Sequence, residues 1–189
     1  ANVAAQNNPE KIYLTEEEQF WITEHPTITG SSNVAFAPYD FVNAGEPTGL
    51  SIDYLNLLTS KVGLKVEYVN FGSFYETLNM AMEQKIDVIH TLSKSEERQK
   101  YFNFSRPYFI DGLALYGRVG SEKINNINDI KDKRIGLVKG QYISTSYLRR
   151  YPDLNYVEFD NNRDALRALV SSKIDVYPYE IMPVEYAIA

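Results

Sequence analysis

The sequence contains no cysteine, no long apolar run and no excess of basic residues. Without cysteine in the sequence we expect no disulfide, no thiolate metal site and no lipid anchor on an N-terminal cysteine. No apolar run approaches the roughly 18 residues of a membrane-spanning helix. Lys and Arg number 19 against 25 Asp and Glu, which gives a net charge of -6. We therefore expect no nucleic-acid partner, because such proteins carry a basic surface.

What the chain does have is apolar material for a core: 44% of its residues are hydrophobic and 13% are aromatic. Period-two and helical patterns alternate along it, which predicts an α/β fold with largely parallel sheets. The alternation occurs in two runs, which predicts two lobes. The expected strands cover residues 28–33, 65–69, 86–89, 112–118, 134–138, 155–159 and 174–177.

Capping signals place the helices and, with the turns, the domain boundaries. Thr15 and Glu18 form a capping box for a helix that ends near Pro26, and Ser73 begins another helix. A third helix is expected to follow residues 49–51 and to end at Gly63. We expect an N-terminal extension and entry helix at 1–26, lobe 1 at 27–111 and lobe 2 at 112–189. The hinge between the lobes is expected at about 107–118.

One charge stands in an unusual place, in the stretch HTLSKSEERQKYFNFSRPYF at 90–109. Ser95 suits the N-cap of a helix, and Arg98 then falls in its first turn, at the positive end of the dipole. The N–H groups there and the planar guanidinium of Arg98 could together bind a carboxylate. The alternative is that Arg98 faces solvent and pairs with an acid such as Glu97.

Five short motifs follow one another along the chain. They are FAPYDF at 36–41, GLSID at 49–53, S-x-S-x-x-R at 93–98, F-S-x-P-Y at 104–108 and DIKDKRIG at 129–136. This order resembles that of the amino-acid-type periplasmic solute-binding proteins (family 3). The resemblance implies two α/β lobes around a ligand cleft that close on the ligand like a flytrap.

The resemblance also implies a binding site for a small amino-acid-like molecule. Arg98, with the N–H groups near Ser93 and Ser95, would hold its α-carboxylate. Glu180 takes the place of the acid that binds its amine. The other implied ligand-binding residues are Phe36, Tyr39, Phe74, Gln141, Tyr142, Ser144 and Thr145. Phe36, Phe74 and Tyr142 could equally be core aromatics, and Glu180 could face solvent. Tyr177 and Tyr179 are expected to pack in the core, and no cofactor or metal is expected.

The motif L-T-E-E-E-x-x-W-I-x-x-H-P at 14–26 resembles the start of flytrap sensor domains in membrane-bound histidine kinases and diguanylate cyclases. We therefore expect a periplasmic sensor domain, without enzymatic activity, followed by a transmembrane segment and a signalling module. The alternatives are a free periplasmic receptor of an ATP-driven importer, a cyclohexadienyl-dehydratase-like enzyme and the regulatory flytrap of a lytic transglycosylase. Such dehydratases tend to have a lysine after a D-G pair that follows the F-S-x-P-Y motif, whereas here Asp111 and Gly112 are followed by Leu113. In the family lobe 2 continues beyond the position of Ala189, so we expect lobe 2 to be incomplete here.

Overall fold

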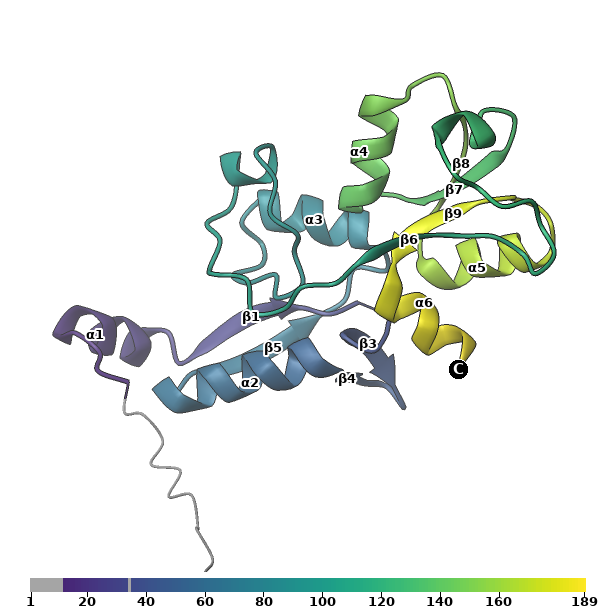
Figure 1. The fold of residues 1–189 in the computed structure, drawn as a ribbon. Helices are drawn as coiled ribbons and strands as arrows, with labels where there is room; N and C mark the ends of the chain where they lie inside the picture. The colour runs from purple at the N-terminus through teal and green to yellow at the C-terminus, as the bar shows by residue number, and fades with distance from the viewer. Residues whose placement is uncertain (1–11, 34) are drawn as a thin grey trace, which may run out of the picture.

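Two groups of strands and helices follow one another along the chain, and each contains a pair of parallel strands (Figure 1). The computed structural model describes residues 12–33 and 35–189, so residues 1–11 of the expected N-terminal extension lie outside it. We call residues 27–111 the first lobe and residues 112–189 the second lobe, following the predicted boundary. None of the helices in the described ranges is long and apolar enough to cross a membrane.

The first lobe is built around β1 (Thr27–Ser31), which pairs in parallel with β5 (Lys65–Val69). Helix α2 (Leu50–Val62) packs against β5 and buries Ile52 and Leu55. The remaining elements are the antiparallel strands β2 (Ala35–Phe36), β3 (Asp40–Asn43) and β4 (Glu46–Thr48), helix α3 (Phe74–Met82) and the 3-10 turn η1 (Arg98–Lys100).

The second lobe is built around β7 (Arg134–Val138), which pairs in parallel with β8 (Asn155–Phe159). Strand β6 (Leu113–Tyr116) pairs antiparallel with β9 (Tyr177–Glu180), so this lobe is mixed rather than purely parallel. The remaining elements are η2 (Ile127–Ile130) and the helices α4 (Tyr142–Arg150), α5 (Asn162–Val170) and α6 (Ile181–Ile188). Figure 1 shows α6 returning toward β3 of the first lobe, where Tyr186 lies 6.1 Å from Phe41 between ring centroids.

Most predicted helix boundaries are confirmed. Helix α1 (Glu16–Glu24) begins with the capping box of Thr15 and Glu18. Ser73 caps α3 by accepting the N–H of Glu76 at 3.2 Å. Gly63 ends α2 with a φ of 81°, a left-handed conformation that favours glycine.

Two predicted elements are wrong, and a third is displaced along the chain. The helix expected from Ser95 is only the turn η1, because Phe102 and Phe104 alternate with exposed neighbours as an extended chain does. The strand expected at 86–89 is reduced to a single bridge between Gly30 and Val88. Here the side chain of Asp87 accepts the N–H of Thr29 at 2.7 Å, a donor that a strand ladder would use.

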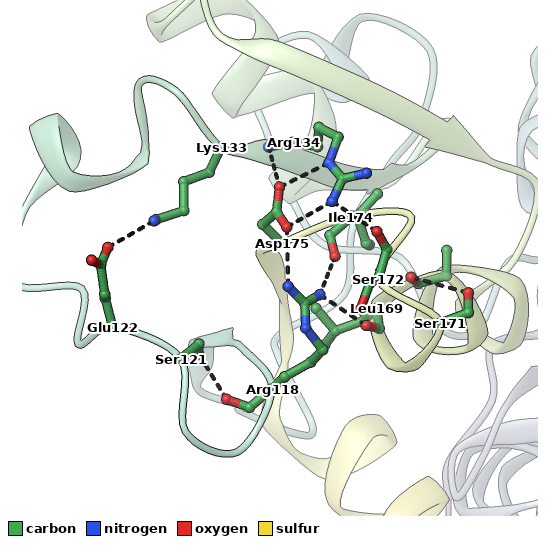
Figure 2. A network of polar contacts seen from close by, with 11 residues as sticks. Arg118, Ser121, Glu122, Lys133, Arg134, Leu169, Ser171, Ser172, Ile174 and Asp175 are labelled. Atoms are coloured by element: carbon green, nitrogen blue, oxygen red, sulfur yellow. Dashed lines mark hydrogen bonds and ion pairs between the residues drawn. The ribbon is translucent and has the colours of Figure 1, made fainter.

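The strand expected at 174–177 instead runs from Tyr177 to Glu180. The chain just before it is held by Asp175, whose carboxylate accepts the backbone N–H of Arg134 at 3.0 Å. The same carboxylate binds the guanidinium groups of Arg134 and Arg118, at 2.8 Å and 3.1 Å (Figure 2). These bonds hold the pKa of Asp175 well below its usual range, Arg134 being the main cause. The network joins the ends of β6, β7 and β9, and β9 carries Glu180.

We expect Asp175→Ala to lower the free energy of unfolding by about 2 kcal/mol, because two guanidinium groups lose a charged acceptor. In a chain of this length that lowers Tm by about 4 to 8 °C. A lowered carboxyl pKa stabilises the fold above the unfolded-state pKa and ceases to do so as pH falls through the folded-state pKa. The difference from the parent should therefore be largest at pH 7 and shrink below pH 4 in thermal melts.

Asp153→Ala is the matched control, because Asp153 is exposed and its substitution removes the same charge. An equal loss of Tm in the two variants would contradict the structural role of Asp175.

Candidate ligand-binding site

A cleft of about 1030 Å³ opens between α3 and η1 of the first lobe and the N-terminal end of α4 in the second. Its size is at the upper end of the range for small-molecule sites. Of the residues predicted from the sequence, the cleft is lined by Ser95, Arg98, Ser144 and Thr145. Residues that the sequence did not indicate also line it, among them Tyr75, Glu76, Lys139 and Glu158.

Arg98 joins the two lobes at this cleft. It is 8% exposed, and its Nη1 and Nη2 donate to the carbonyls of Ser93 and Gly140, each at 2.8 Å. Ser95 fixes the start of η1 by accepting the N–H of Arg98 on its hydroxyl at 3.2 Å. The guanidinium also lies 5.9 Å from the ring centre of Phe74. Arg98 is thus buried, contrary to the alternative of a solvent-facing ion pair.

The electrostatic surroundings of Arg98 are unusual for a buried cation. Burial lowers its pKa, whereas the negative charges of Glu180 and Glu97 act in the opposite direction. Across residues 12–33 and 35–189, no carboxylate lies within ion-pair distance of its guanidinium. Glu97 instead pairs with Arg149 of the second lobe at 2.6 Å. A guanidinium has five N–H groups, so Arg98 has donors beyond the two that bind carbonyls.

The N-terminal end of α4 faces the same cleft. Gln141 occupies the N-cap position and is buried. Ser144 is 1% exposed, and its hydroxyl has no hydrogen-bond partner in the described part of the chain. The hydroxyl of Thr145 bonds back to the carbonyls of Gln141 and Tyr142, and the Tyr142 side chain is exposed. Ser144 is therefore a side chain of α4 whose hydroxyl is available to accept or donate a bond in the cleft.

Gly140 allows the lobes to approach each other here. Its φ is 77°, and a Cβ at this position would lie 3.2 Å from the Cα of Tyr75. A larger residue would push α4 away from α3 and lengthen the bond between Arg98 and the Gly140 carbonyl.

Glu180 occupies the N-cap position of α6, but its side chain makes no capping bond. Its Oε2 is buried and has no hydrogen-bond partner among the described residues. The pKa of Glu180 is raised to about 7, mainly by burial and also by the charge of Asp111, while its own backbone N–H and the charge of Arg98 oppose the rise. Glu180 therefore does not face solvent, and its carboxylate is poised to change charge near neutral pH.

The predicted aromatic residues behave in different ways. Phe36 is half-buried and packs on Tyr39 and Tyr179, at 5.4 Å and 6.4 Å between ring centroids. Tyr39 and Phe74 are buried. Tyr177 and Tyr179 are buried in the core of the second lobe, as predicted.

Eight of the eleven predicted residues fall into two groups, and Phe74, Gln141 and Tyr142 belong to neither. Arg98, Ser95, Ser144 and Thr145 line the cleft, and Ser93 contributes a carbonyl beside it. Phe36, Tyr39 and Glu180 lie in a second group toward the hinge, outside the lining of this cleft. The electrostatic interaction between Arg98 and Glu180 links the two groups.

The first lobe also contains a buried polar pair that the sequence did not predict. His90 Nε2 lies 2.7 Å from the Ser31 carbonyl and 3.6 Å from Asp40 Oδ2. Burial raises the pKa of Asp40 to about 7 and lowers that of His90. The predicted motif at 36–41 includes Asp40, but only the fold brings it to His90, 50 positions away.

Comparison with known proteins places the chain in a family. The profile of the bacterial extracellular solute-binding proteins, family 3, matches residues 28–178, and the chain belongs to this family. The virulence sensor protein BvgS of Bordetella pertussis is 24% identical over 159 residues, covering 84% of this chain and 13% of BvgS. The ABC transporter glutamine-binding protein GlnH of Bacillus subtilis is 28% identical over 137 residues, covering 70% of this chain and 50% of GlnH. The chain thus spans a small part of the sensor and half of the transport protein.

Solved structures confirm the periplasmic-binding-protein-like fold. An ancestral arginine-binding protein bound to arginine has a TM-score of 0.75 at 28% identity, covering 82% of this chain and 70% of that one. The periplasmic VFT2 domain of Bordetella pertussis BvgS has a TM-score of 0.78 at 23% identity, covering 92% of this chain and 74% of that one. The predicted resemblance and α/β fold are therefore confirmed. The domain boundaries and the roles of the individual site residues stay predictions.

Proposed function

We propose that the chain is an extracytoplasmic sensor domain that binds a small amino-acid-like ligand between its lobes. Arg98 and Ser144 receive the α-carboxylate, and Glu180 receives the amine. The lobes close on the ligand, and this conformational change is transmitted to a membrane-bound signalling module elsewhere in the full-length protein. The periplasm is the proposed location.

The observation that carries this proposal is the buried Arg98 at the meeting of the two lobes. A buried cation is costly unless it is paired and hydrogen-bonded. Arg98 has two carbonyl partners but no ion-pair partner in the described ranges, and the unpaired hydroxyl of Ser144 lines the same cleft. A ligand carboxylate would satisfy both groups, because a guanidinium and a carboxylate match in charge and geometry.

The choice of a sensor over a transport receptor rests on the similarity to BvgS and on the entry helix α1. GlnH supports the alternative of a free receptor delivering amino acids to an importer. The two proposals differ in what surrounds the domain. A transmembrane helix and cytoplasmic module in the full-length sequence supports the sensor, and an isolated secreted domain supports the receptor.

We propose that the chain carries out no chemistry of its own. In the dehydratases that the sequence resembles, a lysine tends to follow the D-G pair, and here the residue is Leu113. Incubation with prephenate or arogenate should therefore release no phenylpyruvate or phenylalanine above the uncatalysed rate.

A thermal-shift screen tests the binding proposal. The panel contains the common amino acids, with succinate and glutarate as carboxylates that lack the amine. A ligand at a hundredfold its Kd should stabilise the fold by about 2.7 kcal/mol. That raises Tm by about 5 to 10 °C in a chain of this length. The proposal fails if no amino acid raises Tm, or if Arg98→Ala responds as strongly as the parent.

A further inference from the structure

Asp111 lies at the hinge and contacts both lobes through one oxygen. Its Oδ2 accepts the hydroxyl of Tyr39 in the first lobe at 3.1 Å. The same atom accepts the backbone N–H of Met182 in α6 of the second lobe at 3.2 Å. Asp111 is half-buried, and it is the aspartate of the D-G pair that precedes Leu113.

The bond to Met182 has a consequence for Glu180. The first N–H groups of a helix have no partner within the helix and need one from outside. In α6 the N–H of Ile181 donates to the Gly112 carbonyl at 2.9 Å, and the N–H of Met182 donates to Asp111. The hinge residues thus cap α6. Glu180 stands at the N-cap position but makes no capping bond, so its carboxylate is released from that role.

The bond to Tyr39 fixes the other side of the same group. Tyr39 is buried, and its ring lies 5.4 Å from Phe36 and 4.7 Å from Phe109 between centroids. Burial raises the pKa of its hydroxyl, and the bond to Asp111 raises it further, so Tyr39 stays a donor. Asp111 therefore holds the aromatic turn at 36–39 and the start of α6 at a fixed separation.

We propose that Asp111 is a positioning residue for the amine-binding carboxylate of Glu180. By capping α6 and tethering Tyr39, it directs Glu180 toward the space that faces Arg98, and it joins both lobes at the point where they hinge. The inference rests on the proposed function insofar as it assigns an amine to Glu180. The placement of the Glu180 carboxylate by Asp111 can be tested without any ligand.

The binding experiment uses L-arginine and L-glutamine as probes, with their des-amino analogues 5-guanidinopentanoate and glutaramate. Asp111→Ala removes both bonds. Asp111→Asn removes the charge but keeps an oxygen that can accept both. Asp129→Ala is the matched control, because Asp129 is outside the lining of the cleft and caps η2 by accepting the N–H groups of Asn125 and Asn126.

We expect Asp111→Ala to weaken binding of an aminated probe at least tenfold in calorimetry and of its des-amino analogue less than threefold. Asp111→Asn should stay within threefold of the parent for both. Asp129→Ala should lower Tm without changing the ratio of the two affinities. Equal losses for the aminated and des-amino probes in Asp111→Ala, or no loss for either, would overturn the proposal.

A second measurement separates this inference from the proposed function. The chain is labelled with ¹³C-glutamate, and the Glu180 resonance is identified as the signal missing from Glu180→Gln. The charged or titratable groups that act on Glu180 are Arg98, Asp111, Tyr39, Tyr177 and Tyr179. Asp111→Ala and Asp111→Asn remove the same charge, so a difference between their Glu180 titration midpoints reports a displaced carboxylate.

We expect the midpoints in these two variants to differ by at least half a pH unit. Identical midpoints would overturn the positioning role even if amino acids bind. If the parent binds neither probe, the proposed function fails for these ligands, and the titration still decides the role of Asp111.

Discussion

Replacing Arg98 by alanine should weaken binding of the amino acid identified in the thermal screen by about 2 to 5 kcal/mol, because the ligand carboxylate loses its buried partner. That corresponds to a loss of at least about thirtyfold in affinity. Arg98→Lys should also bind poorly, since an ammonium cannot replace the planar fork of the guanidinium. Lysine also cannot reach the carbonyls of Ser93 and Gly140 with two separate nitrogens.

Arg149→Ala is the matched control for Arg98. Arg149 also reaches across the lobes, to Glu97, but the pair is exposed, with side-chain accessibilities of 71% and 59%. Exposed ion pairs contribute little, so this variant should bind within a fewfold of the parent. Calorimetry on folded protein, checked by circular dichroism, measures both variants. Unchanged affinity in Arg98→Ala, or equal losses in the two variants, would rule out Arg98 as the carboxylate anchor.

Glu180→Gln should weaken the aminated ligand by about 2 kcal/mol or more, because the ammonium loses its charged partner while the side chain keeps its size. The des-amino analogue should bind to the variant as well as to the parent, or better. In the parent this analogue leaves the buried Glu180 carboxylate unpaired, and the variant has no such carboxylate. The measurement is a pair of calorimetric titrations on each protein. Equal affinities for the aminated ligand in parent and variant would place Glu180 outside the site.

The pH dependence gives a second check on Glu180. Its pKa of about 7 means that it gains a proton as pH falls toward 6, and a neutral carboxyl cannot pair with an ammonium. Binding of the aminated ligand to the parent should therefore weaken between pH 8 and pH 6, and this slope should be absent in Glu180→Gln. Arg98 stays charged over this range. Asp40, His90 and Asp111 are other titratable side chains in the surrounding region, and they are present in both the parent and Glu180→Gln.

The contribution of Glu180 to the stability of the fold should depend on pH in the opposite direction to its contribution to binding. A carboxyl whose folded-state pKa is raised stabilises the fold below its unfolded-state pKa, and that contribution is lost as pH rises through the folded-state value. Glu180 ordinarily titrates near 4.5 and here near 7, so Glu180→Gln should melt at the same temperature as the parent or higher at pH 8. A lost affinity together with an unchanged or raised Tm would separate a binding role from a folding defect.

The sequence by itself determined the local features of this protein. Thr15, Ser73 and Gly63 mark helix ends that the structure confirms, because a cap depends on residues within one turn of each other. The alternation of strands and helices gave the α/β fold, and the order of short motifs gave the family. The cap signal at Ser95 predicted a full helix, but the chain becomes extended after the short turn that begins at Arg98.

Only the tertiary structure decided how the site is assembled. The partners of Arg98 include Gly140, 42 positions away, and those of Asp111 are Tyr39 and Met182, 72 and 71 positions away. No periodicity or cap signals such contacts, because they depend on how the lobes meet. The raised pKa of Glu180 has the same origin, since burial is a property of the packed fold. The sequence predicted Arg98 and Glu180 as binding residues. The packing of the two lobes buries both side chains and brings them close enough to interact electrostatically.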